Sequence, residues 1–115
     1  MIRKNLPKPV TPLITPDRKY IVVKERLWRA ANPHLAEDVR QAWTSKLMAA
    51  RRAVSAALRS GDTAALRTAR EGVQEAKLAL GERGPVWWTD GEKDYNRYLV
   101  KNTPYANWFC SLQNG

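Results

Sequence analysis

Side chains suited to metal binding and covalent catalysis are scarce in this chain of 115 residues. There is one cysteine, Cys110, so neither an internal disulfide nor a zinc site built on two cysteines can form. A cysteine nucleophile needs a base beside it, and the one histidine, His34, lies far away in the sequence. We therefore predict no catalytic residue, no cofactor and no metal ion, and a free thiol in a reducing compartment.

Long apolar runs are missing as well. No stretch approaches the roughly 20 apolar residues of a membrane-spanning helix, and the N-terminus lacks the apolar segment of a signal peptide. The expected location is therefore the cytoplasm. A hydrophobic content of 43% with five tryptophans still predicts a folded chain, and its length favours a single small domain.

Acidic residues are too few to balance the basic ones, and the imbalance lies in the first half. Residues 1–30 hold eight basic and two acidic side chains, residues 31–60 hold five and two, and the rest of the chain is neutral. The whole formal charge of +9 therefore belongs to the first sixty residues. Such asymmetry favours a polyanionic partner, chiefly nucleic acid, because bound phosphates release their counterions. The alternative is that the charge serves solubility alone.

Prolines are concentrated near the N-terminus, where four of the seven fall within residues 1–18. Proline fixes φ and removes a hydrogen-bond donor, so this segment is predicted to be an extended basic arm. The domain is then expected over residues 19–115. Within it, residues 19–29 alternate as one β-strand would, and the only other β-favouring run, residues 85–89, is the expected partner strand.

Two long helices make up the middle of the predicted domain. Asn32 and Pro33 have the pattern of a cap and a first helical residue, which predicts a helix over residues 33–60 that ends at Gly61. A second helix is predicted over residues 63–80, after an aspartate cap and before another glycine. The expected fold class is therefore mostly α with a minor β element.

The apolar residues of the two helices predict an antiparallel αα-hairpin. Folding the chain about the turn at Gly61 brings apolar positions opposite one another, and the two residue numbers of every pair add up to the same value. Extending this register places residues 86–88 against the open end of the hairpin. The expected pairs are 58 with 65, 57 with 66, 54 with 69, 50 with 73, 47 with 76 and 43 with 80.

The C-terminal region is rich in aromatic residues. Residues 85–112 contain seven of the ten aromatic side chains and are predicted to form an aromatic, partly helical cap. A short helix is expected over residues 94–101. Thr103 and Pro104 then repeat the pattern of a cap followed by proline, and the apolar residues after them follow at helical spacing, which predicts a final helix.

The strand over residues 19–29 suggests a binding surface. Tyr20 and Trp28 would share one face with Lys24 and Arg26, so that bases stack on the rings while the cations contact phosphates. The alternative is a strand buried on both faces, with the rings in the core and the cations reaching out to solvent. The candidate nucleic-acid-binding residues, including arginines of the following helix, are Lys19, Tyr20, Lys24, Arg26, Trp28, Arg29, Arg40, Arg51 and Arg52.

From Tyr20 to Phe109 the sequence resembles a group of small proteobacterial proteins without an established activity. Gly-Pro-Val-Trp-Trp and Asn-Thr-Pro-Tyr are the most distinctive shared pieces. The resemblance implies a bacterial protein and no mechanism, and it does not extend to the proline-rich arm. The shared segments are RLWR at 26–29, NP at 32–33, MAARRAV at 48–54, ALGERGPVWW at 79–88 and KNTPYANW at 101–108.

These features lead to two functional hypotheses, neither of them enzymatic. The first is a basic protein that binds nucleic acid through its N-terminal half. The second is an adaptor that binds a partner protein through the hairpin, the aromatic cap or the proline-rich arm. Unpaired apolar residues on the hairpin would also allow a second copy of the chain to bind there.

Overall fold

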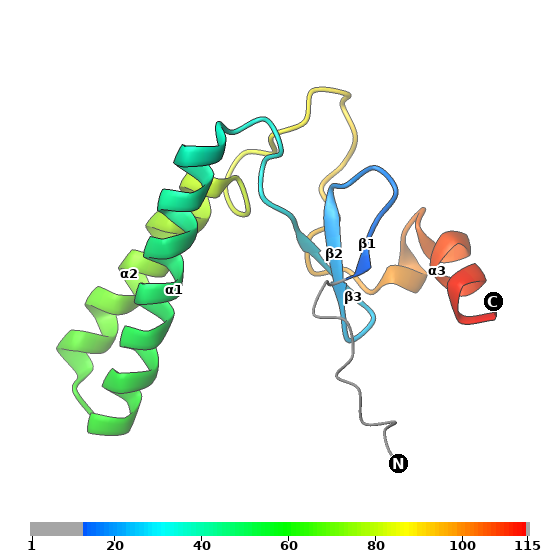
Figure 1. Cartoon of the computed structure of the whole chain (residues 1–115). Coiled ribbons are helices and arrows are strands. Elements are labelled where there is room, and N and C mark those ends of the chain that lie inside the picture. The colour runs from blue at the N-terminus through cyan, green and yellow to red at the C-terminus, as the bar shows by residue number, and fades with distance from the viewer. Residues whose placement is uncertain (1–12, 115) are drawn as a thin grey trace, which may run out of the picture. The chain divides into compact units, whose positions relative to one another are not determined.

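The computed structural model describes residues 13–114, which form two compact units (Figure 1). The sheet unit contains residues 13–30 and 95–114, and the hairpin unit contains residues 31–94. The mostly helical architecture with a small sheet confirms the predicted fold class. The sequence predicts that residues 19–115 fold cooperatively as a single domain, and cooperative folding stays a prediction. The elements are β1 (Leu13–Ile14), β2 (Tyr20–Val23), β3 (Arg26–Arg29), α1 (Glu37–Ser60), α2 (Thr63–Leu80), the 3₁₀-helix η1 (Val100–Asn102) and α3 (Ala106–Asn114).

The sheet is antiparallel and has the strand order β1-β2-β3. The prediction of one strand over residues 19–29 is wrong, because the chain turns back within this segment. Lys24 and Glu25 form the turn with φ angles of 53° and 64°, and positive φ at both central residues is what a tight type I′ hairpin turn requires. β1 comes from the end of the predicted arm, whose residues 1–12 lie outside the described residues.

One face of the sheet is covered by the C-terminal part of the same unit. Tyr20 and Leu27 are fully buried on this face. The Tyr20 ring meets the Tyr105 ring edge-on with 5.6 Å between centroids, and the Tyr20 hydroxyl oxygen accepts a 2.6 Å hydrogen bond from the backbone N–H of Tyr95. The aromatic cluster expected near the C-terminus is therefore present, and its half-buried Tyr95 and Tyr105 pack over the buried Tyr20.

α1 and α2 form the predicted antiparallel hairpin (Figure 1). The buried positions follow the predicted register from its open end to the pair 57–66. Leu58 and Ala65, the pair next to the turn, are exposed, so the packed part of the register stops one pair earlier than expected. The buried cluster at the open end consists of Leu47, Ala76 and Leu80, with Trp43 and Val73 packed against it.

α2 begins and ends where the sequence predicts. The Asp62 carboxylate accepts a 3.0 Å hydrogen bond from the backbone N–H of Ala65, and Gly81 ends the helix with a φ of 86°. In the middle of α2, Gly72 allows a close approach to α1. A Cβ at this position would lie 3.3 Å from the Cβ of Ala50, which is tighter than ordinary van der Waals contact.

α1 ends at Gly61 as predicted, but it begins at Glu37 rather than at residue 33. The backbone N–H of Asn32 donates a 2.7 Å hydrogen bond to the carbonyl of Leu80. This bond ties the chain before α1 to the end of α2, so Asn32 belongs to the connection and does not cap the helix. The predicted start was therefore wrong by about one turn.

The loop after α2 packs on the open end of the hairpin. The predicted strand over residues 85–89 is wrong, because this segment has no strand structure. Trp87 meets the His34 ring edge-on at 6.1 Å between centroids, and its Cδ1 would lie 3.2 Å from a Cβ placed on Gly81. The expectation that this segment folds back over the hairpin is thus confirmed for Trp87, whereas Val86 is exposed.

The predicted helix over residues 94–101 is wrong, because residues 97–99 in its middle pair with β3 instead. The backbone N–H of Leu27 donates to the carbonyl of Tyr98, and the N–H of Arg97 donates to the carbonyl of Leu27. Only the end of the segment is helical, as η1. The final helix is present as α3, and the Thr103 hydroxyl oxygen accepts a 3.2 Å hydrogen bond from a backbone N–H just before it.

Candidate functional site

Strand pairing separates the two aromatic residues that the sequence placed on one face. Tyr20 pairs with Arg29, and Ile21 pairs with Trp28. Directly opposite residues share a face of the sheet, so Tyr20 lies on the covered face and Trp28 on the other. The predicted platform of Tyr20 with Trp28 is therefore wrong. The alternative with both rings in the core is also wrong, because Trp28 is 39% exposed.

The second face of the sheet is the candidate site. One row of side chains crosses all three strands, from Ile14 through Ile21 to Trp28, and a second row pairs Val23 with Arg26. All of these side chains are exposed except Ile21, which is half-buried. Exposed apolar residues beside a tryptophan and an arginine are typical of binding surfaces. The site, here named the Trp28 face, consists of Ile14, Ile21, Val23, Arg26, Trp28 and Arg97.

Arg97 reaches this face from a distant part of the chain. Leu99 bridges to Arg26 in an antiparallel sense, which brings Arg97 opposite Trp28. The guanidinium carbon of Arg97 lies 5.8 Å from the centre of the Trp28 ring, within the range of a cation–π interaction. The Arg26 guanidinium donates a hydrogen bond to the backbone carbonyl of Arg97. Arg97 is absent from the predicted site, because no local pattern indicates that its segment pairs with β3.

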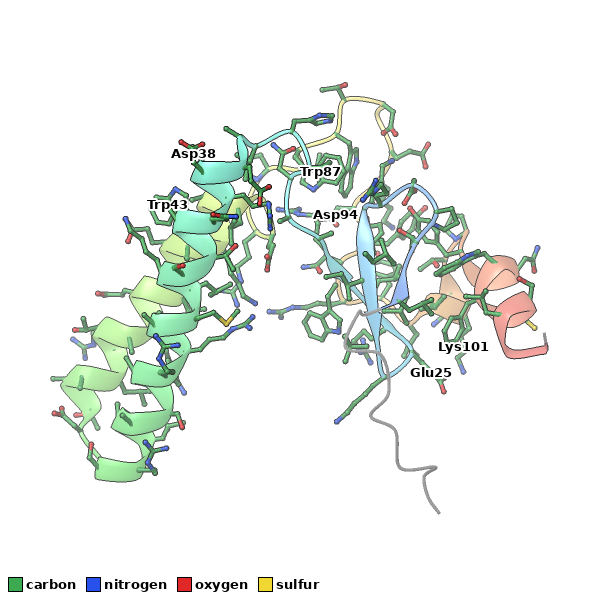
Figure 2. All side chains as sticks on the ribbon, in the orientation of Figure 1. Glu25, Asp38, Trp43, Trp87, Asp94 and Lys101 are labelled. Atoms are coloured by element: carbon green, nitrogen blue, oxygen red, sulfur yellow. The ribbon has the colours of Figure 1, made fainter. Side chains whose placement is uncertain are left out.

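The charge around Trp28 is positive. Lys24, Arg26 and Arg97 are exposed, and none of them has an ion-pair partner within residues 13–114. Glu25, labelled in Figure 2, is the acidic residue of the same turn. An exposed indole ring between unpaired cations can stack on a flat ligand while the cations hold its anionic groups.

Two predicted site residues of the sheet unit do not reach this surface. Lys19 and Arg29 are only 5% and 4% exposed, and both have interaction partners. Arg29 lies on the covered face because it pairs with Tyr20. The structure therefore places these two residues mostly in the interior of the sheet unit and outside the exposed face that carries Trp28.

The three predicted residues of α1 belong to the hairpin unit. Arg40 forms an ion pair with Glu37, and this hydrogen-bonded guanidinium holds the pKa of Glu37 below its usual value. Arg51 and Arg52 are exposed. Lys24, Arg26 and Arg97 therefore belong to the sheet unit and the cations of α1 to the hairpin unit, so only the former lie on or beside the Trp28 face.

Comparison with protein-family models, with curated proteins and with solved structures finds no match for this chain. The resemblance to small proteobacterial proteins therefore stays a prediction. In the part of the chain that the structure describes, no helix combines the length and the apolar character needed to cross a membrane. The proposed function accordingly rests on the chemistry of the Trp28 face.

Proposed function

We propose that the protein is a non-catalytic nucleic-acid-binding protein that takes single strands on the Trp28 face. The observation that carries the proposal is the exposure of Trp28, which is 39%, beside the Arg97 guanidinium, whose carbon lies 5.8 Å from the centre of the ring. Arg26 donates a hydrogen bond to the backbone carbonyl of Arg97 and so lies beside the same ring. In a single strand the bases are open to stacking on a ring, whereas in a duplex they stack on one another. An exposed sheet face can accommodate such a strand.

The strength of binding follows from stacking and charge. One base stacked on Trp28 contributes about 1–3 kcal/mol. Lys24, Arg26 and Arg97 can contact up to three phosphates, and for single strands each contact lowers the logarithm of the association constant by roughly 0.7 for a tenfold rise in salt. Three contacts therefore predict a loss of affinity of roughly 20-fold between 50 and 200 mM salt.

The test is fluorescence anisotropy of a labelled single-stranded oligonucleotide, titrated with the full chain at several salt concentrations. Trp28→Ala is expected to weaken binding at least about fivefold, whereas Trp28→Phe keeps a ring and retains most of the affinity. Arg97→Gln should weaken binding and reduce its salt dependence. Lys101→Gln is the matched control, because it removes the same charge from an exposed position of the sheet unit outside the Trp28 face.

Two outcomes would contradict the proposal. One is negligible binding of both DNA and RNA single strands at low salt. The other is equal affinity of the wild type and Trp28→Ala, with circular dichroism showing that the variant is folded. Binding to duplex as tight as to single strands would show that charge acts without stacking, which also contradicts the assigned role of Trp28.

The apolar row of the same face favours a second candidate function, the docking of a partner protein. Val23, which is 47% exposed, distinguishes the two functions. Val23→Thr removes apolar surface but keeps a β-branched side chain, so it should weaken protein docking more than oligonucleotide binding, which rests on the Trp28 ring and the cations. Recovery of one stoichiometric protein after nuclease treatment favours docking, and recovery that is lost on nuclease treatment favours nucleic acid. A second copy bound through the hairpin would appear as a dimer in sedimentation.

A further inference from the structure

A second group of arginines lies in the hairpin unit and shares no residue with the Trp28 face. Arg51 of α1, Arg70 of α2 and Arg83 of the loop after α2 line one surface hollow of about 400 Å³. Val54 and Val73, both half-buried, complete the lining from the two helices. Binding sites for small molecules commonly have volumes of about 300–1,000 Å³. The hollow is therefore large enough for a small ligand.

The positive charge of this hollow is not neutralised. Within residues 13–114, none of the three arginines has an ion-pair partner. Arg83 donates a hydrogen bond to the side-chain carbonyl oxygen of Gln74, which holds the arginine along α2 without compensating its charge. Like charges that converge on one hollow repel one another, and a bound anion converts this repulsion into attraction.

A neighbouring hollow provides a contrast. It is larger, about 700 Å³, and it is also lined by Arg70, but its lining includes Glu71 and Glu75 as well as Arg67. A surface of mixed charge does not select anions. No carboxylate is among the described residues that line the smaller hollow, so the smaller hollow is the one expected to select anions.

We propose that the arginine hollow binds a nucleotide through its phosphate group. Guanidinium groups present paired N–H donors in a plane, which match the oxygens of a phosphate. Val54 and Val73 offer an apolar floor to the sugar and base, which would add affinity that inorganic phosphate alone cannot obtain. A free mononucleotide and a nucleotide within a strand present the same chemistry, and the experiment distinguishes these two sources.

The test is isothermal titration calorimetry of the full chain at low salt with three probes, namely AMP, inorganic phosphate and a short oligothymidylate. AMP or the oligonucleotide is expected to bind at least fivefold more tightly than phosphate. Arg51→Gln and Arg70→Gln should each weaken that binding about tenfold or more, because each removes a charge-assisted contact. Arg52→Gln is the matched control and should change affinity less than twofold, since it removes the same charge from the adjacent exposed residue outside the hollow.

Binding of AMP that depends on Arg51 identifies a free nucleotide as the source, and oligonucleotide binding that depends on Arg51 without binding of AMP identifies a strand. The proposal is overturned if no probe binds, if phosphate binds as tightly as both nucleotides, or if Arg51→Gln and Arg52→Gln weaken binding equally. Trp28→Ala should leave the part of AMP binding that depends on Arg51 unchanged, because Trp28 is not among the residues that line the hollow. The nucleotide site and the proposed function of the Trp28 face can therefore fail separately.

Discussion

The turn between β2 and β3 is built from two residues that strain it. Lys24 and Glu25 have φ angles of 53° and 64°, where an L-amino acid other than glycine or asparagine is disfavoured. The turn is nevertheless tied into the sheet unit, because the backbone carbonyl of Glu25 accepts a 2.9 Å hydrogen bond from the N–H of Val100. Glu25→Gly relieves the strain at one position and leaves this backbone bond in place, so it should stabilise the protein.

The size of the effect is the difference between two terms. A side chain at positive φ costs about 1–2 kcal/mol, and glycine loses about 0.5–1 kcal/mol more conformational entropy on folding. At the centre of both ranges, Glu25→Gly is thus expected to raise the free energy of unfolding by about 0.75 kcal/mol. With a urea m-value near 1.5 kcal/mol/M, the midpoint moves up by roughly 0.5 M. Tryptophan fluorescence and far-ultraviolet circular dichroism follow the transition.

Glu25→Ala separates backbone strain from the loss of the negative charge. Alanine at positive φ is strained as glutamate is, so this variant should unfold within about 0.5 kcal/mol of the wild type. The reasoning is refuted if Glu25→Gly is no more stable than Glu25→Ala, because the turn would then gain nothing from glycine. A gain of equal size in both variants would assign the effect to charge.

Leu47→Ala should lower the free energy of unfolding by about 2–4 kcal/mol, since Leu47 is 3% exposed in the hairpin core, while Leu58→Ala at a side chain 58% exposed should change it by less than about 0.5 kcal/mol in the same urea titration. Asp62→Ala should cost about 1 kcal/mol by removing the cap of α2, and unchanged helix stability by circular dichroism would contradict this. The Glu37 carboxyl should titrate below its usual range by NMR, and Arg40→Ala should raise its pKa. Because the folded pKa is the lower one, this pair stabilises the fold above the unfolded pKa, and its contribution disappears as pH falls through the folded pKa.

The hairpin could be predicted because its signals are local. Asp62 and Gly81 mark the ends of α2, and the positions between them repeat at helical spacing. A single short turn at Gly61 joins the helices, so one arithmetic rule sets which residues face each other. The start of α1 escaped prediction because the bond from Asn32 to the end of α2 is a contact between distant residues.

The candidate site was only partly predictable. Arg26 and Trp28 were expected on one face and lie there, but Tyr20 was expected with them and is buried on the opposite face. The cause is the turn at Lys24 and Glu25, whose sequence lacks the glycine or asparagine that usually marks such a reversal. A strand that reverses exchanges the faces of its two halves, so one undetected turn changed half of the predicted platform.

Periodicity, helix caps and the distribution of charge are relations among near neighbours. From them the order of amino acids was sufficient to define α2, the end of α1, the register of the hairpin and the basic first half. Which cations remain exposed depends instead on contacts between distant parts of the chain. Arg97 reaches Trp28 only because its segment pairs with β3, and Arg83 reaches Arg51 and Arg70 only after the chain has folded. Such contacts join residues far apart in the chain, and the packing and hydrogen bonds that create them override local preferences, so only the folded structure reveals these two candidate sites.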